Sequence, residues 1–246
     1  MIIYTTGCAK AGTTLMQMMI SNGFDGMRHV RMQDRRKLKA KPNEHVSVKC
    51  KTRDVAGILK EAGNEIRIIW IIRHPYALLL SRSVVTHFKN YHNHPREVMA
   101  SFNRLRQFGS DPRILVVKFE ELILAPDHVQ QRISEFAGLD PVRPFAECHE
   151  HFDMGDIEAP ALKGARPPDK SRLAPWRDEQ PKPHELSRLD SSLKQYPKLI
   201  DEMEYHDYTP HVNGTCVGAV WQHERRRKQK KALSTRDGRD ERKRIL

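Results

Sequence analysis

Short apolar runs alternate with segments of helical spacing along about the first 140 residues of the chain. The runs cover residues 1–4, 46–49, 66–72 and 114–117, and the run at 66–72 is rich in β-branched side chains. Apolar runs of strand length are typical of strands that are buried on both faces of a parallel sheet. The alternation predicts an α/β fold of three layers, with a central, mostly parallel sheet flanked by helices.

The segments between the runs predict the helices. A crowded apolar pattern from Leu15 to Ile20 indicates a buried helix directly after the first strand. Apolar residues recur on one face of segments 55–62 and 95–108, and of the segment that opens at Pro126 and stops at Gly138. Proline suits the first turn of a helix and glycine suits its end. Helical spacing returns after Pro183 and ends near Tyr205.

Two stretches lack this regularity. Residues 22–45 have little apolar periodicity and many basic side chains, so we expect mostly loop there. Such a stretch is either a solvated surface or a wall that gathers an acidic substrate. Residues 139–183 contain eight prolines and are also expected to be irregular.

Composition and charge divide the chain into two parts. Its 246 residues carry a formal charge of +12, and residues 222–246 alone contain eleven Lys or Arg against four Asp or Glu. We therefore predict one α/β domain over residues 1–210 and a basic, flexible tail over residues 211–246. The positive charge favours anionic partners, and the tail has a possible anionic partner of its own.

The cysteines and the apolar stretches indicate a compartment. Cys8, Cys50, Cys148 and Cys216 are widely spaced without a CxxC pair, so we expect reduced thiols and no zinc site. Apolar stretches such as 66–72 fall far short of the ~20 residues of a membrane span. These features predict a cytoplasmic protein with no transmembrane segment, no signal peptide and no bound metal.

The first strand leads into a candidate anion site. Gly7 and Gly12 bracket a short loop between the strand and the buried helix, and Lys10 lies within it. The first N–H groups of a helix lack internal partners and attract anions. The spacing is that of a nucleotide P-loop, but the position after Gly12 holds Thr13 where that motif has lysine. The residues expected to bind the anion are Ala9, Lys10, Ala11, Gly12, Thr13 and Thr14.

A second candidate anion site follows the third strand. Arg73 comes directly after the run at 66–72, and Ser81 falls about two turns into the helix that Pro75 is expected to open. The carboxyl ends of strands in open α/β sheets are where ligands bind. Arginine and serine there can hold one phosphate from two sides.

Together these stretches resemble the sulfotransferases that use 3′-phosphoadenosine 5′-phosphosulfate (PAPS). The first loop of that family is Pro-Lys-Ser/Ala-Gly-Thr-Thr, and residues 9–14 match it except at Ala9. Its second signature, Arg-x-Pro followed after five residues by Ser, is matched by Arg73, Pro75 and Ser81. Residues 116–122, Phe-Ala-Gly-Leu at 136–139 and the segment from Ser171 to Arg177 are similar to later family elements. The resemblance spans roughly residues 1–208.

The resemblance implies a P-loop NTPase-like fold and the transfer of a sulfuryl group from PAPS to a hydroxyl or amine. Residues 9–14 would bind the 5′-phosphosulfate and Arg73 and Ser81 the 3′-phosphate, with Ser171 and Arg172 in a later nucleotide loop. The product would be 3′-phosphoadenosine 5′-phosphate (PAP). The acceptor, a glycan or a small molecule, stays open.

The catalytic residues are less sharply predicted. Lys10 would neutralise the leaving phosphate, and Lys49 or Lys51 would neutralise the sulfuryl oxygens or orient the acceptor. Many cytosolic members end the second strand in Lys-Thr-His, whose histidine is the general base. Here the matching residues are Lys49-Cys50-Lys51, so the base position holds a lysine. Candidates by residue type alone are His29, His45, Asp54 and His87.

Two other functions compete with this hypothesis. A P-loop kinase or NTPase would need Gly-Lys-Ser/Thr and an aspartate for magnesium, and the first of these is absent at Gly12-Thr13. A basic module without catalysis would use residues 222–246 to bind nucleic acid or another anion.

Overall fold

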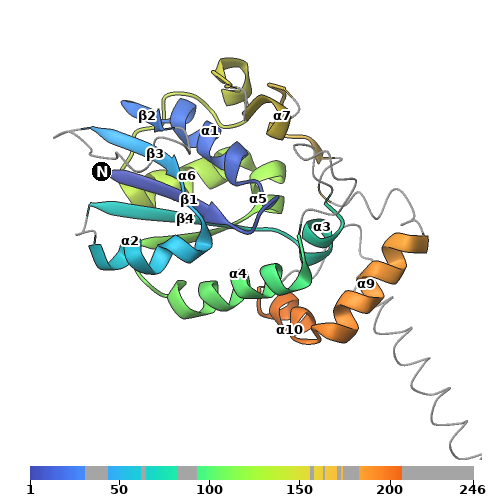
Figure 1. Ribbon diagram of the computed structural model, residues 1–246. Helices are drawn as coiled ribbons and strands as arrows, with labels where there is room; N and C mark the ends of the chain where they lie inside the picture. The colour runs from blue at the N-terminus through green and yellow to red at the C-terminus, as the bar shows by residue number, and fades with distance from the viewer. Residues whose placement is uncertain are drawn as a thin grey trace, which may run out of the picture. The chain divides into compact units, whose positions relative to one another are not determined.

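Figure 1 shows the computed structural model of the chain. The structure describes residues 1–30, 44–61, 65–81, 93–155, 158–162, 164–170, 173 and 183–206. The chain divides into two compact units, Met1–Leu199 and Ile200–Leu246. The domain boundary predicted at residue 210 and the basic tail lie outside the described residues, so both stay predictions.

The first unit is built on a five-stranded sheet in which neighbouring strands are parallel. The order across the sheet is β2-β3-β1-β4-β5. The strands are β1 (Ile2–Gly7), β2 (Met27–Val30), β3 (His45–Lys49), β4 (Ile66–Ile72) and β5 (Ile114–Lys118). The α/β fold with a central parallel sheet is therefore confirmed. Because the strands run the same way, their carboxyl ends lie along one edge, where such sheets bind ligands.

Helices cover both faces of the sheet, as Figure 1 shows. The helices α1 (Thr13–Gly23) and α6 (Pro126–Ala137) cover one face, and α2 (Val55–Glu61) and α4 (Pro95–Phe108) cover the other. The reason is the direction of each crossover. The connection from β1 to β2 through α1 leads toward one edge of the sheet, whereas those from β3 to β4 through α2 and from β4 to β5 through α4 lead toward the other. Right-handed crossovers therefore place α1 on the face opposite to α2 and α4.

The core lies between these layers. Strand β4, which lies between β1 and β5, is almost wholly buried, and Trp70 within it is 1% exposed. Met16, Met19 and Ile20 of α1 are fully buried against the same sheet. Burying each such side chain contributes about 1.5–3 kcal/mol. These buried apolar side chains are therefore the main source of the free energy that stabilises the sheet and its helices. The loop between β1 and α1 is held at the edge of the sheet by this packed core.

The remaining helices connect or follow the strands. They are the 3-10 turns η2 (Thr52–Asp54) and η3 (Cys148–His151), with α3 (Pro75–Leu79), α5 (Phe119–Leu124), α7 (Glu158–Leu162), α9 (Pro183–Gln195) and α10 (Lys198–Tyr205). The helices expected after Pro183 are confirmed and end at Tyr205 as predicted. Gly138 ends α6 with a φ of 63°, the left-handed conformation that glycine adopts without strain.

The structure corrects three expectations. Residues 22–45 were expected to be mostly loop, but they contain the edge strand β2. Pairing with β3 makes this segment a strand, although its own apolar periodicity is too weak to predict one. Residues 139–183 contain η3 and α7. The helix after Arg73 ends at Leu79, so Ser81 lies beyond it, and the Ser81 N–H donates to Leu78 O at 3.4 Å in a tighter turn.

Candidate functional site: an anion loop between two strand ends

The loop between β1 and α1 has the crowded backbone that its glycines predict. Gly12 has a φ of 104°, and a Cβ there would overlap the Phe119 ring. A Cβ on Gly7 would overlap the carbonyl oxygen of Ile71 on the neighbouring strand. Lys10 itself adopts a left-handed φ of 65°. The loop is thus pressed against β4 and α5, and only glycine fits at its two ends.

The loop presents the amino end of α1 to the edge of the sheet. The Ala11 N–H donates to Cys8 O at 3.1 Å, which closes the turn. The helix is 11 residues long, and its N-cap Gly12 has no side chain that could cap the first N–H groups. Those N–H groups and the helix dipole therefore favour an anion at this point. The residues present fit a phosphate or sulfate group.

Lys49 extends the site from the end of β3. Its Nζ lies 3.0 Å from Thr14 Oγ1, so the strand end and the helix start are joined by a side-chain contact. Burial lowers the pKa of Lys49, the Glu158 carboxylate opposes that shift, and the charge of Lys10 adds to it. The structure thus brings Lys10, Lys49 and Thr14 together, and the catalytic roles of the two lysines stay predictions.

Lys51 lies apart from this cluster. It is exposed and precedes η2, where its backbone N–H donates to Asp54 Oδ2 at 3.3 Å. Lys49 is the last residue of β3, whereas Lys51 lies two residues beyond the end of that strand. Its catalytic role stays a prediction.

Arg73 joins the end of β4 to the same loop. Its Nη1 donates to the carbonyl oxygen of Lys10 at 3.0 Å, and its guanidinium stacks 4.4 Å from the Phe119 ring centre. Behind it, burial raises the pKa of Glu120, while its hydrogen bond from the His74 N–H and the charge of Arg73 oppose the rise. The two predicted cationic positions, Lys10 and Arg73, are therefore neighbours at one edge of the sheet.

Asn93 holds the loop from the opposite side. Its side chain is 2% exposed, and its Nδ2 donates to Ala9 O at 2.8 Å and to Leu78 O at 3.1 Å. Arg188 of α9 donates to Asn93 O at 2.7 Å and to Leu79 O at 3.1 Å. Neither residue could be predicted from the sequence, because a lone asparagine before His94-Pro95 carries no local signal beyond a helix start, and Arg188 makes its contact with Asn93 across 95 positions.

We expect Asn93→Ala to loosen the phosphate loop. The substitution leaves Ala9 O and Leu78 O without their buried donor, which destabilises the fold by about 1–3 kcal/mol. Affinity for PAP should fall about tenfold, since a loop that must be reordered on binding loses part of the binding free energy. Calorimetry and thermal melting measure the two effects.

Asn103→Ala is the matched control, because Asn103 is an exposed residue of α4. It should change neither PAP affinity nor melting temperature. Equal affinity for PAP in Asn93→Ala and the wild-type protein would contradict a role for Asn93 in holding the loop.

Ser81 is half-buried beyond α3, whereas Ser171, Arg172 and His87 lie outside the described residues. Of the described candidates for the base, His45 begins β3 at its amino end and Asp54 lies in η2. His29 precedes the last residue of β2 and therefore lies near the carboxyl edge, where the anion loop is.

Cys8 lies in the anion loop, and its chemistry is restricted by its surroundings. Burial, with a smaller effect of Glu97, raises the pKa of the Cys8 thiol to about 12. Because the thiolate is the reactive form, we expect iodoacetamide at pH 8 to leave Cys8 unmodified in the folded protein. Mass spectrometry of peptides checks this, with the urea-unfolded chain as the control. Labelling of folded Cys8 at the unfolded rate would be the contrary result.

None of the three cysteines that the structure describes forms a disulfide. Within the described residues, no group of three or more His, Cys, Asp or Glu side chains could hold a metal ion. No helix among those residues combines the length and the apolar character needed to cross a membrane.

Comparison with known proteins finds similarity to solved structures. No protein-family model matches the chain, and no curated protein matches its sequence. The sulfotransferase domain from the curacin biosynthetic pathway superposes with a TM-score of 0.52 at 15% identity, covering 78% of this chain and 97% of that domain. Mouse sulfotransferase SULT7A1, complexed with PAP, gives 0.53 at 14% identity, covering 82% and 88%.

A third structure agrees with these two. The sulfotransferase domain of the Synechococcus PCC 7002 olefin synthase gives a TM-score of 0.51 at 15% identity, covering 78% of this chain and 92% of that domain. All three are sulfotransferase structures, and each is covered over most of its length. Similarity at such identity establishes the fold. The chain therefore has the sulfotransferase fold.

Proposed function

We propose that the protein is a sulfotransferase that moves a sulfuryl group from PAPS to a hydroxyl or amine of an acceptor. The observation that carries the proposal is the hydrogen bond from Arg73 Nη1 to Lys10 O at 3.0 Å. It joins the anion loop after β1 to the end of β4. A ligand with phosphates on both its 5′ and 3′ sides needs two cationic positions, and these two are adjacent.

The residues of the loop have distinct roles in this proposal. PAPS supplies an activated sulfuryl group on a phosphate leaving group. Lys10 and the first N–H groups of α1 stabilise the charge that grows on that phosphate, and Lys49 neutralises the sulfuryl oxygens. Thr14 Oγ1, 3.0 Å from Lys49 Nζ, accepts a hydrogen bond from the ammonium group and holds it in place. Arg73 and Ser81 bind the 3′-phosphate, together with the predicted Ser171 and Arg172.

Calorimetry with PAP and with ATP tests the proposal. The protein should bind PAP at least a hundredfold more tightly than ATP without added magnesium, because the Arg73 position serves a 3′-phosphate that ATP lacks. A preference for ATP, or ATP hydrolysis that depends on magnesium, would instead support the kinase or NTPase hypothesis. Equal and weak binding of both nucleotides, with steep salt dependence, would support a basic binding module.

A further inference from the structure

Arg188 of α9 binds two distant main-chain carbonyl groups at once. Its Nε donates to Leu79 O at 3.1 Å and its Nη2 donates to Asn93 O at 2.7 Å, across 109 and 95 positions of the chain. These two nitrogens form one edge of the planar guanidinium, so their N–H groups point the same way. Leu79 ends α3 and Asn93 comes shortly before α4, so the guanidinium holds the end of one helix beside the start of the next.

Asn93 continues this set of contacts into the anion loop. Its Nδ2 donates to Ala9 O at 2.8 Å, and its Oδ1 accepts from Cys8 Sγ at 3.8 Å. Burial raises the pKa of Cys8 to about 12, so the thiol keeps the hydrogen that this contact needs. Both ends of the Asn93 amide therefore contact the loop, while the main-chain carbonyl of the same residue accepts from Arg188.

The same bonds hold the end of α3. The last carbonyl groups of a helix have no partner within it. Leu78 O accepts from Asn93 Nδ2 at 3.1 Å, and Leu79 O accepts from Arg188. Ser81, which the proposed function assigns to the 3′-phosphate, follows Leu79 by two positions. One arginine on α9 thus supports the segment on the 3′ side directly and the loop on the 5′ side through Asn93.

Burial makes these bonds costly to lose. Leu78, Leu79 and Asn93 are all buried. Arg188 itself is half-buried. A buried carbonyl group that loses its donor is left as an unsatisfied acceptor, which is unfavourable. We therefore expect the loop and the end of α3 to shift when the Arg188 guanidinium is removed, because the carbonyl groups must find other donors.

We infer that Arg188 is a positioning residue of the nucleotide site and that it couples the docking of α9 to nucleotide binding. It contacts neither phosphate in this scheme and acts through Asn93 and the end of α3. A coupling free energy is reciprocal, so a nucleotide that binds better when α9 is docked must favour the docked helix by the same factor. The inference rests on the proposed function and adds a residue of α9 to the support of its site.

Calorimetry with PAP measures the contribution of Arg188. Arg188→Ala should weaken PAP binding about tenfold, because the loop must then be reordered on binding. Arg188→Lys keeps the charge but supplies no planar pair of donors, and it should weaken binding about fivefold with a melting temperature close to that of the wild type. Should Arg188→Ala fail to fold, Arg188→Lys decides the question. Wild-type affinity in a folded variant of Arg188 would overturn the inference.

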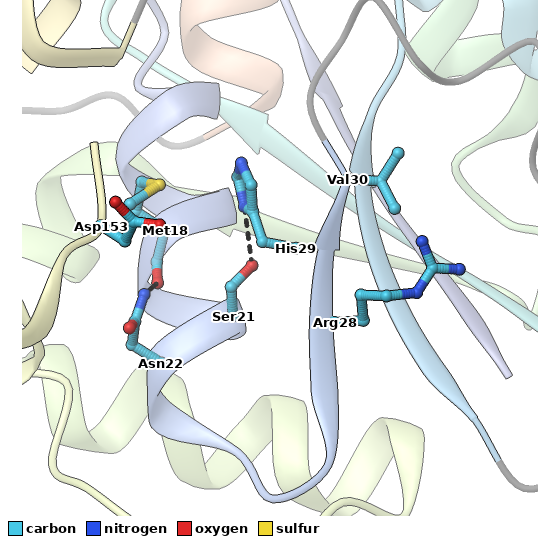
Figure 2. A pocket seen from close by; sticks show the side chains of 7 residues that line it. All are labelled: Met18, Ser21, Asn22, Arg28, His29, Val30 and Asp153. Carbon is cyan, nitrogen blue, oxygen red and sulfur yellow. Dashed lines mark hydrogen bonds between the residues drawn. The ribbon is translucent and has the colours of Figure 1, made fainter. Parts of the chain in front are cut away.

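Arg143→Ala is the matched control. Arg143 also donates to a distant main-chain carbonyl, that of Asn22, at 3.2 Å across 121 positions. Asn22 lines a pocket of about 420 Å³ between α1 and β2, which Figure 2 shows, and none of the seven residues that line this pocket belongs to the anion loop. Arg143→Ala should therefore leave PAP affinity unchanged. Equal losses in the two alanine variants would point to general destabilisation and would overturn the inference.

A double-mutant cycle separates an indirect role from a contact with the ligand. Asn93→Ala removes the amide but keeps the main-chain carbonyl that accepts from Arg188, so each substitution removes only its own bonds. Both side chains hold the last turn of α3, and the loop contact belongs to Asn93. The double variant should therefore bind PAP at most about twofold more weakly than the weaker single variant. Independent effects would multiply to about a hundredfold, which would contradict the indirect role.

Hydrogen exchange tests the reciprocal effect. Saturating PAP should slow the exchange of α9 amides about tenfold in the wild-type protein, the same factor by which Arg188→Ala weakens PAP binding. In Arg188→Ala this slowing should fall below about twofold. Amides of α6, which takes no part in these bonds, are the control. Equal slowing in α6 and α9, or none in α9, would overturn the coupling.

Failure of the inference differs from failure of the proposed function. A wild-type protein that binds no PAP would contradict the proposed function and this inference with it. A wild-type protein that binds PAP, with Arg188 variants that bind it equally well, would contradict the inference alone.

Discussion

We expect Lys10→Asn to lower the rate of sulfuryl transfer about a thousandfold, because the charge that stabilises the leaving phosphate is lost. Asparagine is chosen over alanine for a structural reason. Lys10 adopts a φ of 65°, and asparagine tolerates this left-handed conformation better than most residues. The substitution therefore removes the charge with little strain in the loop. The rate of PAP release from PAPS, with a panel of hydroxyl and amine acceptors, measures the effect.

Lys60→Asn is the control for lost charge. Lys60 is an exposed residue of α2, so its removal changes the net charge equally without touching the loop. It should leave transfer unchanged, and both variants should melt within a few degrees of the wild-type protein. Normal turnover by Lys10→Asn would count decisively against the proposed role of this lysine.

Arg73→Lys should weaken PAP binding by about a hundredfold. The guanidinium binds Lys10 O and stacks on Phe119, and it offers a planar set of five donors that matches a phosphate. An ammonium group supplies the charge but neither the fork nor the stacking geometry. The loss should fall mainly on the dissociation constant for PAP, measured by calorimetry, with a smaller effect on the rate at saturating PAPS.

The same strand supplies a matched control for this variant. Arg67 also lies on β4, donates to Phe136 O at 3.2 Å and stacks 5.6 Å from the Phe136 ring centre, but it is near the amino end of the strand. Arg67→Lys should reduce stability somewhat without changing PAP affinity. If the two variants weakened PAP binding equally, a general loss of stability would explain both results. That outcome would contradict the proposal that Arg73 binds the 3′-phosphate.

Much of the fold could be predicted from local pattern. The run at 66–72 is apolar on both faces, and a segment of that kind has few stable solutions other than a buried parallel strand. The edge strand β2 could not be predicted in this way. It is half exposed and only four residues long, so pairing with β3 decides its conformation and its own sequence contributes little.

The candidate site also has a part that local sequence predicts and a part that depends on tertiary contacts. The loop from Gly7 to Gly12 and the arginine after β4 are encoded locally, since glycine spacing and a cation after a buried strand are visible without any tertiary contact. The prediction that a helix carries Ser81 was wrong, because the hydrogen bonds of the Leu80 and Ser81 N–H groups end α3 at Leu79. The orientation of the predicted Lys49 toward Thr14 depends on the neighbouring positions of β3 and α1.

The chain's own order of residues was thus enough to determine a parallel α/β sheet, an anion loop at its edge and two cationic positions. Tertiary structure alone decided that Asn93 holds Ala9 across 84 positions, and that His29 and Glu158 face each other. The physical reason is the distance along the chain over which each kind of interaction acts. Periodicity and turn chemistry act over a few residues, whereas contacts between distant segments exist only once the core has packed and brought them together.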